Sequence, residues 1–505
     1  MLNRQQNASI SKLLIPRRRT DANTPLPSKE IYSFLQTTDQ SDLLWETILE
    51  RSEIEKHLLD YNRESFRAAA ESPCGHGVVH DAITFSSLSH EALELLSGTV
   101  PSEWHGDDDI LREFLASFTI PPTVTDHGDI LTEVSEEDIC RGFKTWSETT
   151  STSPSGRHLG HYKALVQEPT LLRCFSRFIN IAISRGIAIP RWCNATNVLI
   201  EKDPGYPRIN RLRIIHLFEA DFNFFLKLQW GHRLVRQACD LDLLHPGQHG
   251  SVPRRTSLDP IMLTQLTTDL CRILKHDFAR FDNDASSCYD RIIVALGMLA
   301  ARRCGMPTNA IRLHADALRF MKYTVKTMHG ISEENYHGTA YAPLFGTGQG
   351  SGASPSVWLT LVVLMLNTLD RIVPDRINFV PVQGQRNHSR LVDAFVDDTS
   401  LGFTSAGNME YDQLIQRLQD VAQTWEHILF LSGGKLNLSK CSWYVLSWEW
   451  KSGRPTLRPI TPQDKKIHLQ QGDQTQEFEI RRLTQLNQQG CWVCTSIHWA
   501  ISPII

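Results

Sequence analysis

The first candidates for chemistry are two adjacent acids, Asp397 and Asp398, which stand among apolar residues. Phe395 and Val396 precede them, and Leu401 follows after a short interval. Apolar residues on both sides of an acidic pair predict a β-hairpin with the acids at its tip. Neighbouring carboxylates repel one another and resist burial, and a divalent cation relieves both costs. Because Mg²⁺ takes oxygen ligands, the pattern indicates a magnesium site.

A third acid, Asp284, lies much earlier in the chain. It follows the short run Asp277–Phe281 and precedes a helical pattern over Tyr289–Leu299, so it sits where a strand would give way to a helix. One acid at a strand end beside two acids in a hairpin is what a two-metal site requires, with ions ~3.5–4 Å apart. Asp282 shares the strand face and could assist. Asp290 is interpreted as a helix-start residue.

Each acid has a simpler interpretation when it is taken alone. An Asp-Asp pair is usually a solvated turn. An Asp before a helix, such as Asp284, is most often an N-cap. The metal-site hypothesis therefore depends on the combination and on its order along the chain.

Five further blocks accompany the acids. They are Val198-Leu-Ile-Glu-Lys202, Leu212-Arg-Ile-Ile-His-Leu217, Gly247-Gln-His-Gly250, Gly346-Thr-Gly-Gln-Gly-Ser-Gly-Ala-Ser-Pro355 and Leu431-Ser-Gly-Gly-Lys-Leu-Asn-Leu-Ser-Lys440. The first predicts a strand ending in charged residues. The fourth is a glycine-rich loop before a helix, in which Pro355 suits the first helical turn.

Together these blocks resemble the ordered motifs of reverse transcriptases, in particular those of non-LTR retrotransposons. Asp284 and Tyr289 are similar to motif A, Gln349-Gly350 with Ser354-Pro355 to motif B, and Phe395-Val-Asp-Asp398 to motif C. The block ending at Lys440 resembles motif D. The blocks with Lys202 and Arg213 resemble the two fingers motifs, and Gly247–Gly250 the segment before motif A. The resemblance covers roughly residues 150 to 450.

The resemblance implies an RNA-directed DNA polymerase that uses an RNA template, a DNA primer and dNTPs. Asp284, Asp397 and Asp398 would hold two Mg²⁺ ions, for which Mn²⁺ can substitute. Lys202 and Arg213 would neutralise the triphosphate, and Lys440 would donate a proton to the pyrophosphate. Tyr289 would exclude a 2′ hydroxyl. Gln349 and Gly350 would lie beside the template and the nucleotide. Arg233 would contact nucleic-acid backbone or form a structural ion pair.

The implied fold is α+β. It is a right-hand polymerase with fingers and an antiparallel palm sheet backed by helices, plus a helical N-terminal region. The expected divisions are a flexible segment (1–40), a helical region (41–147), fingers (148–245), a palm with motifs A to D (246–450) and a divergent or truncated tail (451–505). Helical spacing is seen over residues 43–54, 110–118 and 171–183.

Two rival hypotheses stay open. An RNA-dependent RNA polymerase shares the paired Asp, but Val396, Tyr289 and Ser354-Pro355 favour DNA synthesis. A decayed or domesticated element would bind nucleic acid without catalysis. The sequence departs from the family in its glycine-rich motif B, in Ile214 after the fingers Arg, and in lacking a recognisable thumb or primer grip after residue 450.

Composition adds few constraints. The chain has 505 residues, and its net charge of −4 gives no overall basic signal for nucleic acid, although a local groove can still be basic. Scattered cysteines indicate a reducing compartment, and Cys491, Cys494 and His498 lack a fourth zinc ligand. No signal peptide is seen, and Val357–Leu366 is too short to span a bilayer. We expect an intracellular protein, nuclear or cytoplasmic, without a membrane partner.

Overall fold

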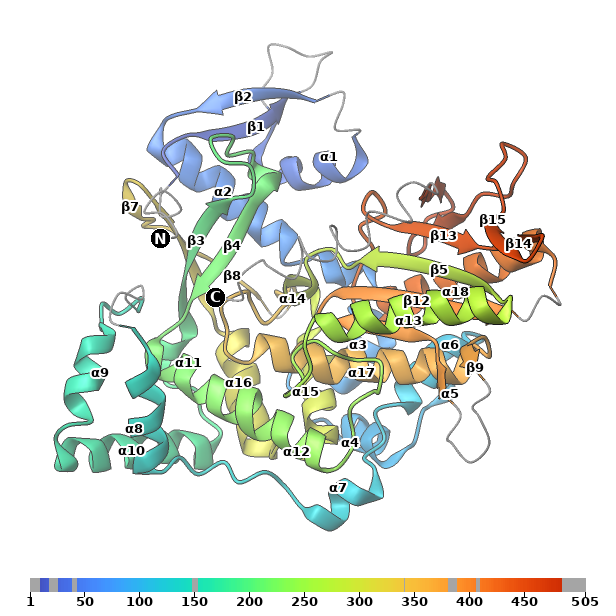
Figure 1. The fold of residues 1–505 in the computed structure, drawn as a ribbon. Helices are drawn as coiled ribbons and strands as arrows, with labels where there is room; N and C mark the ends of the chain where they lie inside the picture. Colours follow the sequence, from blue (N-terminus) through green and yellow to red (C-terminus); the bar gives the residue numbers. More distant parts are fainter. Residues whose placement is uncertain are drawn as a thin grey trace.

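The structure is a computed structural model that describes residues 10–17, 26–38, 43–147, 153–339, 341–379, 388–405 and 409–483. Over these residues the protein is a mixed α+β structure in which small sheets lie among many helices (Figure 1). This agrees with the α+β class that the sequence predicts. Residues 484–505, including Cys491, Cys494 and His498, lie outside the described residues, as do residues 148–152, where the expected fingers begin.

The N-terminal part combines a strand pair with short helices. The strands β1 (Leu13–Arg17) and β2 (Leu44–Ile48) are antiparallel. The helices are α1 (Ile31–Thr37), α2 (Arg51–Ser65), α3 (Gly77–Ile83), α4 (His90–Ser97), α5 (Ser102–His105), α6 (Asp109–Ala116), α7 (Pro122–His127) and α8 (Glu136–Thr145). Residues 1–40 are predicted to be flexible and residues 43–54 helical. The strand pair β1–β2 and helix α1 correct both expectations, because pairing with β1 overrides the helical spacing.

A second sheet follows, with its supporting helices. Its strands run in the order β4-β3-β6-β7, and β8 also pairs with β6. Figure 1 shows β3 and β4 reaching up to the β1–β2 pair. The bounds are α9 (Leu159–Leu165), α10 (Pro169–Arg185), β3 (Asn194–Glu201), β4 (Leu212–Leu217), α11 (Ala220–Leu226), α12 (Val235–Asp240), α15 (Val294–Arg303), α16 (Thr308–Arg319), β6 (Lys322–Thr327), β7 (Gly330–Ile331) and β8 (Tyr336–His337). The helix predicted over residues 171–183 and the strand ending before Lys202 are confirmed.

The central sheet carries the predicted acids. Its order is β11-β12-β5-β13-β18, antiparallel except for the β13–β18 pair. The remaining bounds are α13 (Leu258–Leu274), β5 (Asp277–Asp284), α14 (Cys288–Arg291), α17 (Ser354–Ile372), β9 (Ile377–Phe379), β10 (His388–Arg390), β11 (Val392–Phe395), β12 (Asp398–Ser405), α18 (Tyr411–Leu431), β13 (Ser442–Leu446), β14 (Trp448–Lys451), β15 (Arg454–Leu457), β16 (His468–Gln470), β17 (Glu477–Glu479) and β18 (Arg481–Arg482). Residues 451–482, expected as a divergent tail, thus include a strand of this sheet.

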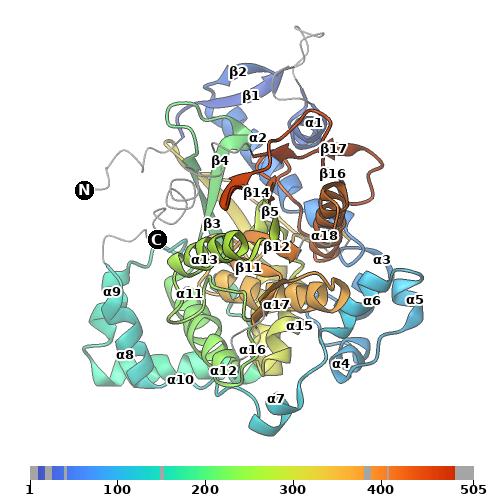
Figure 2. The same ribbon diagram turned by 45° about the vertical axis from the view of Figure 1, so that its right-hand side comes forward.

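Two helices cover opposite faces of the central sheet. The indole of Trp425 on α18 donates to Asn283 Oδ1 at 3.0 Å, and Arg280 donates to Thr264 Oγ1 on α13 at 2.6 Å. Arg280 and Asn283 point to opposite faces because side chains alternate along a strand. Figure 2 shows α13 and α18 on either side of β5 and β12. Asp282 and Asp284 share the face of Arg280, and Asp284 ends the strand.

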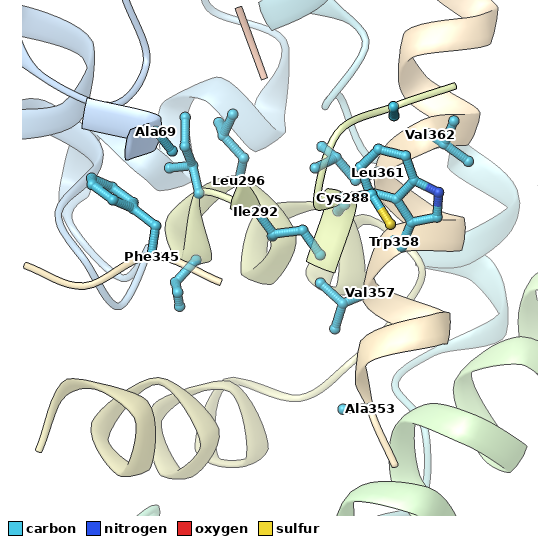
Figure 3. Close-up of a cluster of buried hydrophobic side chains, with 14 of the residues drawn as sticks. Ala69, Cys288, Ile292, Leu296, Phe345, Ala353, Val357, Trp358, Leu361 and Val362 are labelled. Carbon is cyan, nitrogen blue, oxygen red and sulfur yellow. The ribbon is translucent and has the colours of Figure 1, made fainter. Parts of the chain in front are cut away.

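Helix α17 forms the core beneath this region. Figure 3 shows Ile292 and Leu296 in one buried cluster with Val357, Trp358 and Leu361 of α17. Pro355 occupies the first turn of α17, as predicted. In the described part of the chain, α17 alone has the length and apolarity to cross a membrane, and 72% of its apolar window is buried inside the protein. It is longer than the run Val357–Leu366 but is a core helix, as expected.

Candidate active site

The predicted hairpin is present, and it brings two acids to the end of β5. Phe395 pairs with Asp398, so Val396 and Asp397 are the two residues of the turn. Asp398 in turn pairs directly with Asp284, the last residue of β5. Directly opposed residues of an antiparallel pair have neighbouring side chains. The three acids that the sequence predicts together therefore meet at one end of the sheet.

The hairpin turn is held by groups outside it. Val396 has a φ of 61°, which a β-branched residue rarely adopts. Its carbonyl accepts a hydrogen bond of 2.7 Å from the indole of Trp358 on α17. A Cβ added to Gly250 would lie 2.2 Å from the Val396 nitrogen. Close backbone approach therefore requires glycine at position 250.

The segment Gly247–Gly250, expected only as a block before motif A, runs alongside β11. The amide of His249 donates to the Ala394 carbonyl at 2.7 Å, and the amide of Ala394 donates to the Gly247 carbonyl at 2.8 Å. The segment thus adds a short hydrogen-bonded stretch of backbone beside β11, next to the hairpin. Neither Trp358 nor this pairing was predicted. The spacing of Gly247 and Gly250 is the only sequence signal that could have suggested a close approach.

Burial and mutual repulsion disfavour charge on the hairpin acids. Burial, followed by the negative charges of Asp397 and Asp284, raises the pKa of Asp398 to about 7. Burial also raises the pKa of Asp397, and Asp284 adds to the increase. A nearby cation would stabilise the ionised form of these carboxylates, because it offsets both their burial and their mutual repulsion.

Two cationic side chains lie near these acids, and a third, Lys202, lies near those two cations. Lys440 Nζ lies 2.9 Å from Asp284 Oδ2. Its charge lowers the pKa of both hairpin acids, and the charge of Arg213 on β4 lowers that of Asp397. Desolvation lowers the pKa of Lys202, and the positive charges of Arg211, Arg213 and Lys440 lower it further. The predicted cations Lys202, Arg213 and Lys440 are thus within electrostatic reach of one another.

Lys440 reaches Asp284 because the chain before it pairs with the end of β5. The amide of Asn437 donates to the Asp284 carbonyl at 2.9 Å, and the amide of Ser286 donates to the Lys435 carbonyl at 2.7 Å. The amide of Lys440 then closes a turn onto Asn437 at 2.8 Å. These backbone hydrogen bonds therefore fix the position of the Lys440 Cα, from which its side chain reaches Asp284.

The glycine-rich loop lies against both Tyr289 and β4. The amide of Thr347 donates to the Tyr289 carbonyl at 3.0 Å, and the Gln349 carbonyl accepts from the amide of His216 at 2.7 Å. A Cβ on Gly350, whose φ is 114°, would lie 2.5 Å from the His216 carbonyl oxygen. Tyr289 is half-buried, and burial raises the pKa of its phenol, with Cys288 and Asp397 adding to the effect. The structure thus places Tyr289, Gln349 and Gly350 in one region with the acids.

Several other predicted residues have structural roles. Asp282 accepts hydrogen bonds from Arg280 at 2.8 Å and from Ser400 at 2.6 Å. Arg233 forms an ion pair of 2.9 Å with Asp138, the structural alternative that the sequence left open. Asp290 lies within α14, and burial raises its pKa to about 7 while the nearby Lys202 lowers it. The helix expected over Tyr289–Leu299 is split into α14 and α15, which corrects that prediction.

The donor set suits a hard cation in chemical type. Asp284, Asp397 and Asp398 offer the carboxylate oxygens that Mg²⁺ prefers. As the side chains stand, the described residues contain no group of three or more His, Cys, Asp or Glu arranged to hold a metal ion. Binding two ions would therefore require rotation of these side chains.

No model of a known protein family matches the chain, and no curated protein sequence matches it.

Proposed function

We propose that this protein is an RNA-directed DNA polymerase of the reverse transcriptase type. The observation that carries the proposal is the cross-strand pairing of Asp284 with Asp398, beside Asp397 in the hairpin turn. On this proposal the central sheet is the polymerase palm, and the sheet of β3 and β4 belongs to the fingers. The substrates are an RNA template, a DNA primer and dNTPs, and the cofactor is Mg²⁺, or Mn²⁺ in its place.

The three acids would hold two divalent ions. When bound, such ions activate the primer 3′ hydroxyl and neutralise charge on the leaving pyrophosphate. The raised pKa values of Asp397 and Asp398 support this role, because a dication would reverse the cost of charging them.

The surrounding residues would bind the nucleotide. Lys202 and Arg213 would neutralise the triphosphate, since the positive charges of an ammonium and a guanidinium suit phosphate oxygens. Lys440 would donate a proton to the departing pyrophosphate. The Tyr289 ring would leave no room for a 2′ hydroxyl, and the glycine at position 350 would allow close approach of template and nucleotide.

The test is primer extension on an RNA template with Mg²⁺, comparing the wild-type protein with Asp397→Asn. We expect the substitution to lower extension at least about 1000-fold while leaving template-primer affinity nearly unchanged, because the amide keeps the shape but loses the charge. Asp126→Asn, an exposed aspartate on α7, is the matched control and should extend normally. Retained extension by Asp397→Asn would remove the metal-ligand role.

The same assay separates the two rival functions. An RNA-dependent RNA polymerase would extend with rNTPs in preference to dNTPs on the same template. A protein retained only for nucleic-acid binding would bind template-primer and extend with neither set, in Mg²⁺ or in Mn²⁺. Either result would contradict the proposal.

A further inference from the structure

A short N-terminal segment, residues 66–71, lies against the parts of the chain that carry several predicted site residues. Its last four residues form a 3-10 helix. The Phe66 carbonyl accepts a hydrogen bond of 2.7 Å from the amide of Phe345, just before the glycine-rich loop. Ala69 lies in the buried cluster that includes Ile292 (Figure 3). The sequence assigns this segment only to a helical N-terminal region, yet it packs on the core beneath the candidate site.

Arg291 connects this segment with two other parts of the chain. It ends α14, two residues after Tyr289, and its side chain is only 6% exposed. Its guanidinium pairs with Glu71 at 2.5 Å, donates to the Gly433 carbonyl at 2.8 Å and donates to the Ala68 carbonyl at 3.3 Å. One buried side chain thus joins the helix that carries Tyr289, the N-terminal segment and the loop that follows α18.

Gly433 lies where these three parts meet. A Cβ added to it would lie 2.7 Å from the Arg291 carbonyl oxygen and 3.1 Å from the Ala69 Cβ. Its φ of 93° also favours glycine, so the close approach depends on this residue type. The loop from Gly433 leads to Lys440, whose backbone is held by pairing with the end of β5. The hydrogen bond from Arg291 to this loop therefore bears on the placement of Lys440.

We propose that Arg291 and Glu71 are a positioning pair, through which the N-terminal segment holds α14 and the loop before Lys440 in place. This role rests on the proposed function, in which Tyr289 selects the sugar and Lys440 lies near the pyrophosphate. Within the described residues, Glu71 is the carboxylate that forms an ion pair with Arg291. A buried guanidinium that loses its counter-charge is strongly unfavourable, so it would shift toward water. Tyr289 and Lys440 would then be less well positioned.

Glu71→Gln tests the pair, because the Glu71 side chain is 48% exposed and the amide keeps its shape, so the fold should survive. Hydrogen exchange of the full chain should become at least about 10-fold faster in peptides 284–291 and 431–440 and stay unchanged elsewhere. Glu113→Gln is the matched control. It removes an ion pair of 3.2 Å between α6 and Arg371 of α17, another link to the N-terminal region, and should leave both peptides unchanged.

Single-nucleotide primer extension adds a functional readout. Glu71→Gln should lower kcat about 10-fold and reduce the preference for dNTP over rNTP, because Lys440 and Tyr289 both lose support. A loss of stability alone would reduce the amount of active protein and leave the dNTP-to-rNTP ratio unchanged. Unchanged exchange in both peptides, or an unchanged ratio in an active variant, would overturn the pair's role. A wild-type protein that extends no primer would instead remove the proposed function, and hydrogen exchange would still decide whether the pair holds these segments.

Discussion

At the residue scale, the candidate site depends on three neighbouring carboxylates, on Lys440 and Arg213 beside them, and on Lys202 beside those two cations. Asp398 is held next to Asp284 by strand pairing, and Lys440 pairs with Asp284. Electrostatic effects on pKa connect Asp397 with Arg213, and they connect Lys202 with Arg213 and Lys440. Each group therefore acts on its neighbours, and single substitutions should have effects that are not additive.

Tyr289 gives a prediction about sugar selection. Tyr289→Ala should raise rNTP incorporation relative to dNTP incorporation on the order of 100-fold, because the space that the ring fills would open for a 2′ hydroxyl. Tyr289→Phe should keep the discrimination, since the ring remains and only the hydroxyl is lost. Single-nucleotide insertion with matched dNTP and rNTP measures the ratio. Equal ratios for the Ala and Phe variants would contradict the gate role.

The charged residues of the candidate site were predictable from the sequence, whereas the residues that hold them in place were not. Asp284, Asp397 and Asp398 stand out because acids among apolar residues are unusual. Trp358 does not stand out, since its neighbours in α17 are apolar and a tryptophan there indicates only a core position. That its indole donates to Val396 depends on how α17 packs against the hairpin, which spacing along the chain does not determine.

At the element scale, the hairpin of β11 and β12 relies on α17 for its shape. Trp358→Phe should remove the hydrogen bond to the Val396 carbonyl and leave that carbonyl without its partner, at a cost of about 1–3 kcal/mol. We expect the Mg²⁺ concentration for half-maximal extension to rise several-fold, because Asp397 would be less well positioned. Extension measured across a Mg²⁺ titration gives this value.

The control for this prediction is another indole. Trp448 lies on β14, and its buried indole nitrogen has no hydrogen-bond partner among the described residues. Trp448→Phe thus makes the same chemical change without removing a hydrogen bond, and its Mg²⁺ titration should match the wild type. If both variants shift equally, the effect comes from lost packing and not from the hydrogen bond to the turn.

Helices and strands with a strong sequence pattern of their own were predictable. Those whose form depends on contacts with distant residues were not. The spacing of α10 and the strand pattern of β3 agree with the structure. The helix predicted from Tyr289 breaks because the Ile292 carbonyl accepts from the amide of Gly346 in the glycine-rich loop. Residues 44–48 have helical spacing yet form β2, because β1 pairs with them.

At the scale of the whole molecule, a buried acid in α18 should make stability depend on pH. Burial raises the pKa of Glu426 from 4.5 to about 7, although its carboxylate accepts a hydrogen bond of 2.9 Å from the Gly472 amide. The folded protein holds this proton more tightly than the unfolded chain. Its contribution to stability is therefore full below pH 4.5 and is lost as the pH rises through about 7.

Glu426→Gln should flatten this dependence. The amide cannot ionise and its oxygen can still accept from Gly472, so the variant should gain on the order of 1–3 kcal/mol relative to wild type between pH 5 and pH 8. Urea unfolding at the two pH values measures the difference. Glu477→Gln, an exposed glutamate on β17, should leave the slope unchanged. Parallel slopes for wild type and Glu426→Gln would assign the pH dependence to other groups.

The arrangement of the two sheets could not be predicted from order along the chain. Motif order indicates which blocks belong together, but the contact of the glycine-rich loop with both β4 and Tyr289 follows from packing among elements far apart in sequence.

The turn at Val396 has a consequence for how this protein can vary. Its backbone conformation is one that valine disfavours, and Gly250 and Trp358 hold it from outside. We therefore expect the residues at positions 250, 358 and 396 to vary together among related sequences. A glycine at 396 would adopt the turn conformation without strain, so the hydrogen bond from Trp358 would no longer be needed to hold it. Any larger residue at 250 would collide with the turn, and the hairpin would have to change before Asp397 and Asp398 could keep their positions.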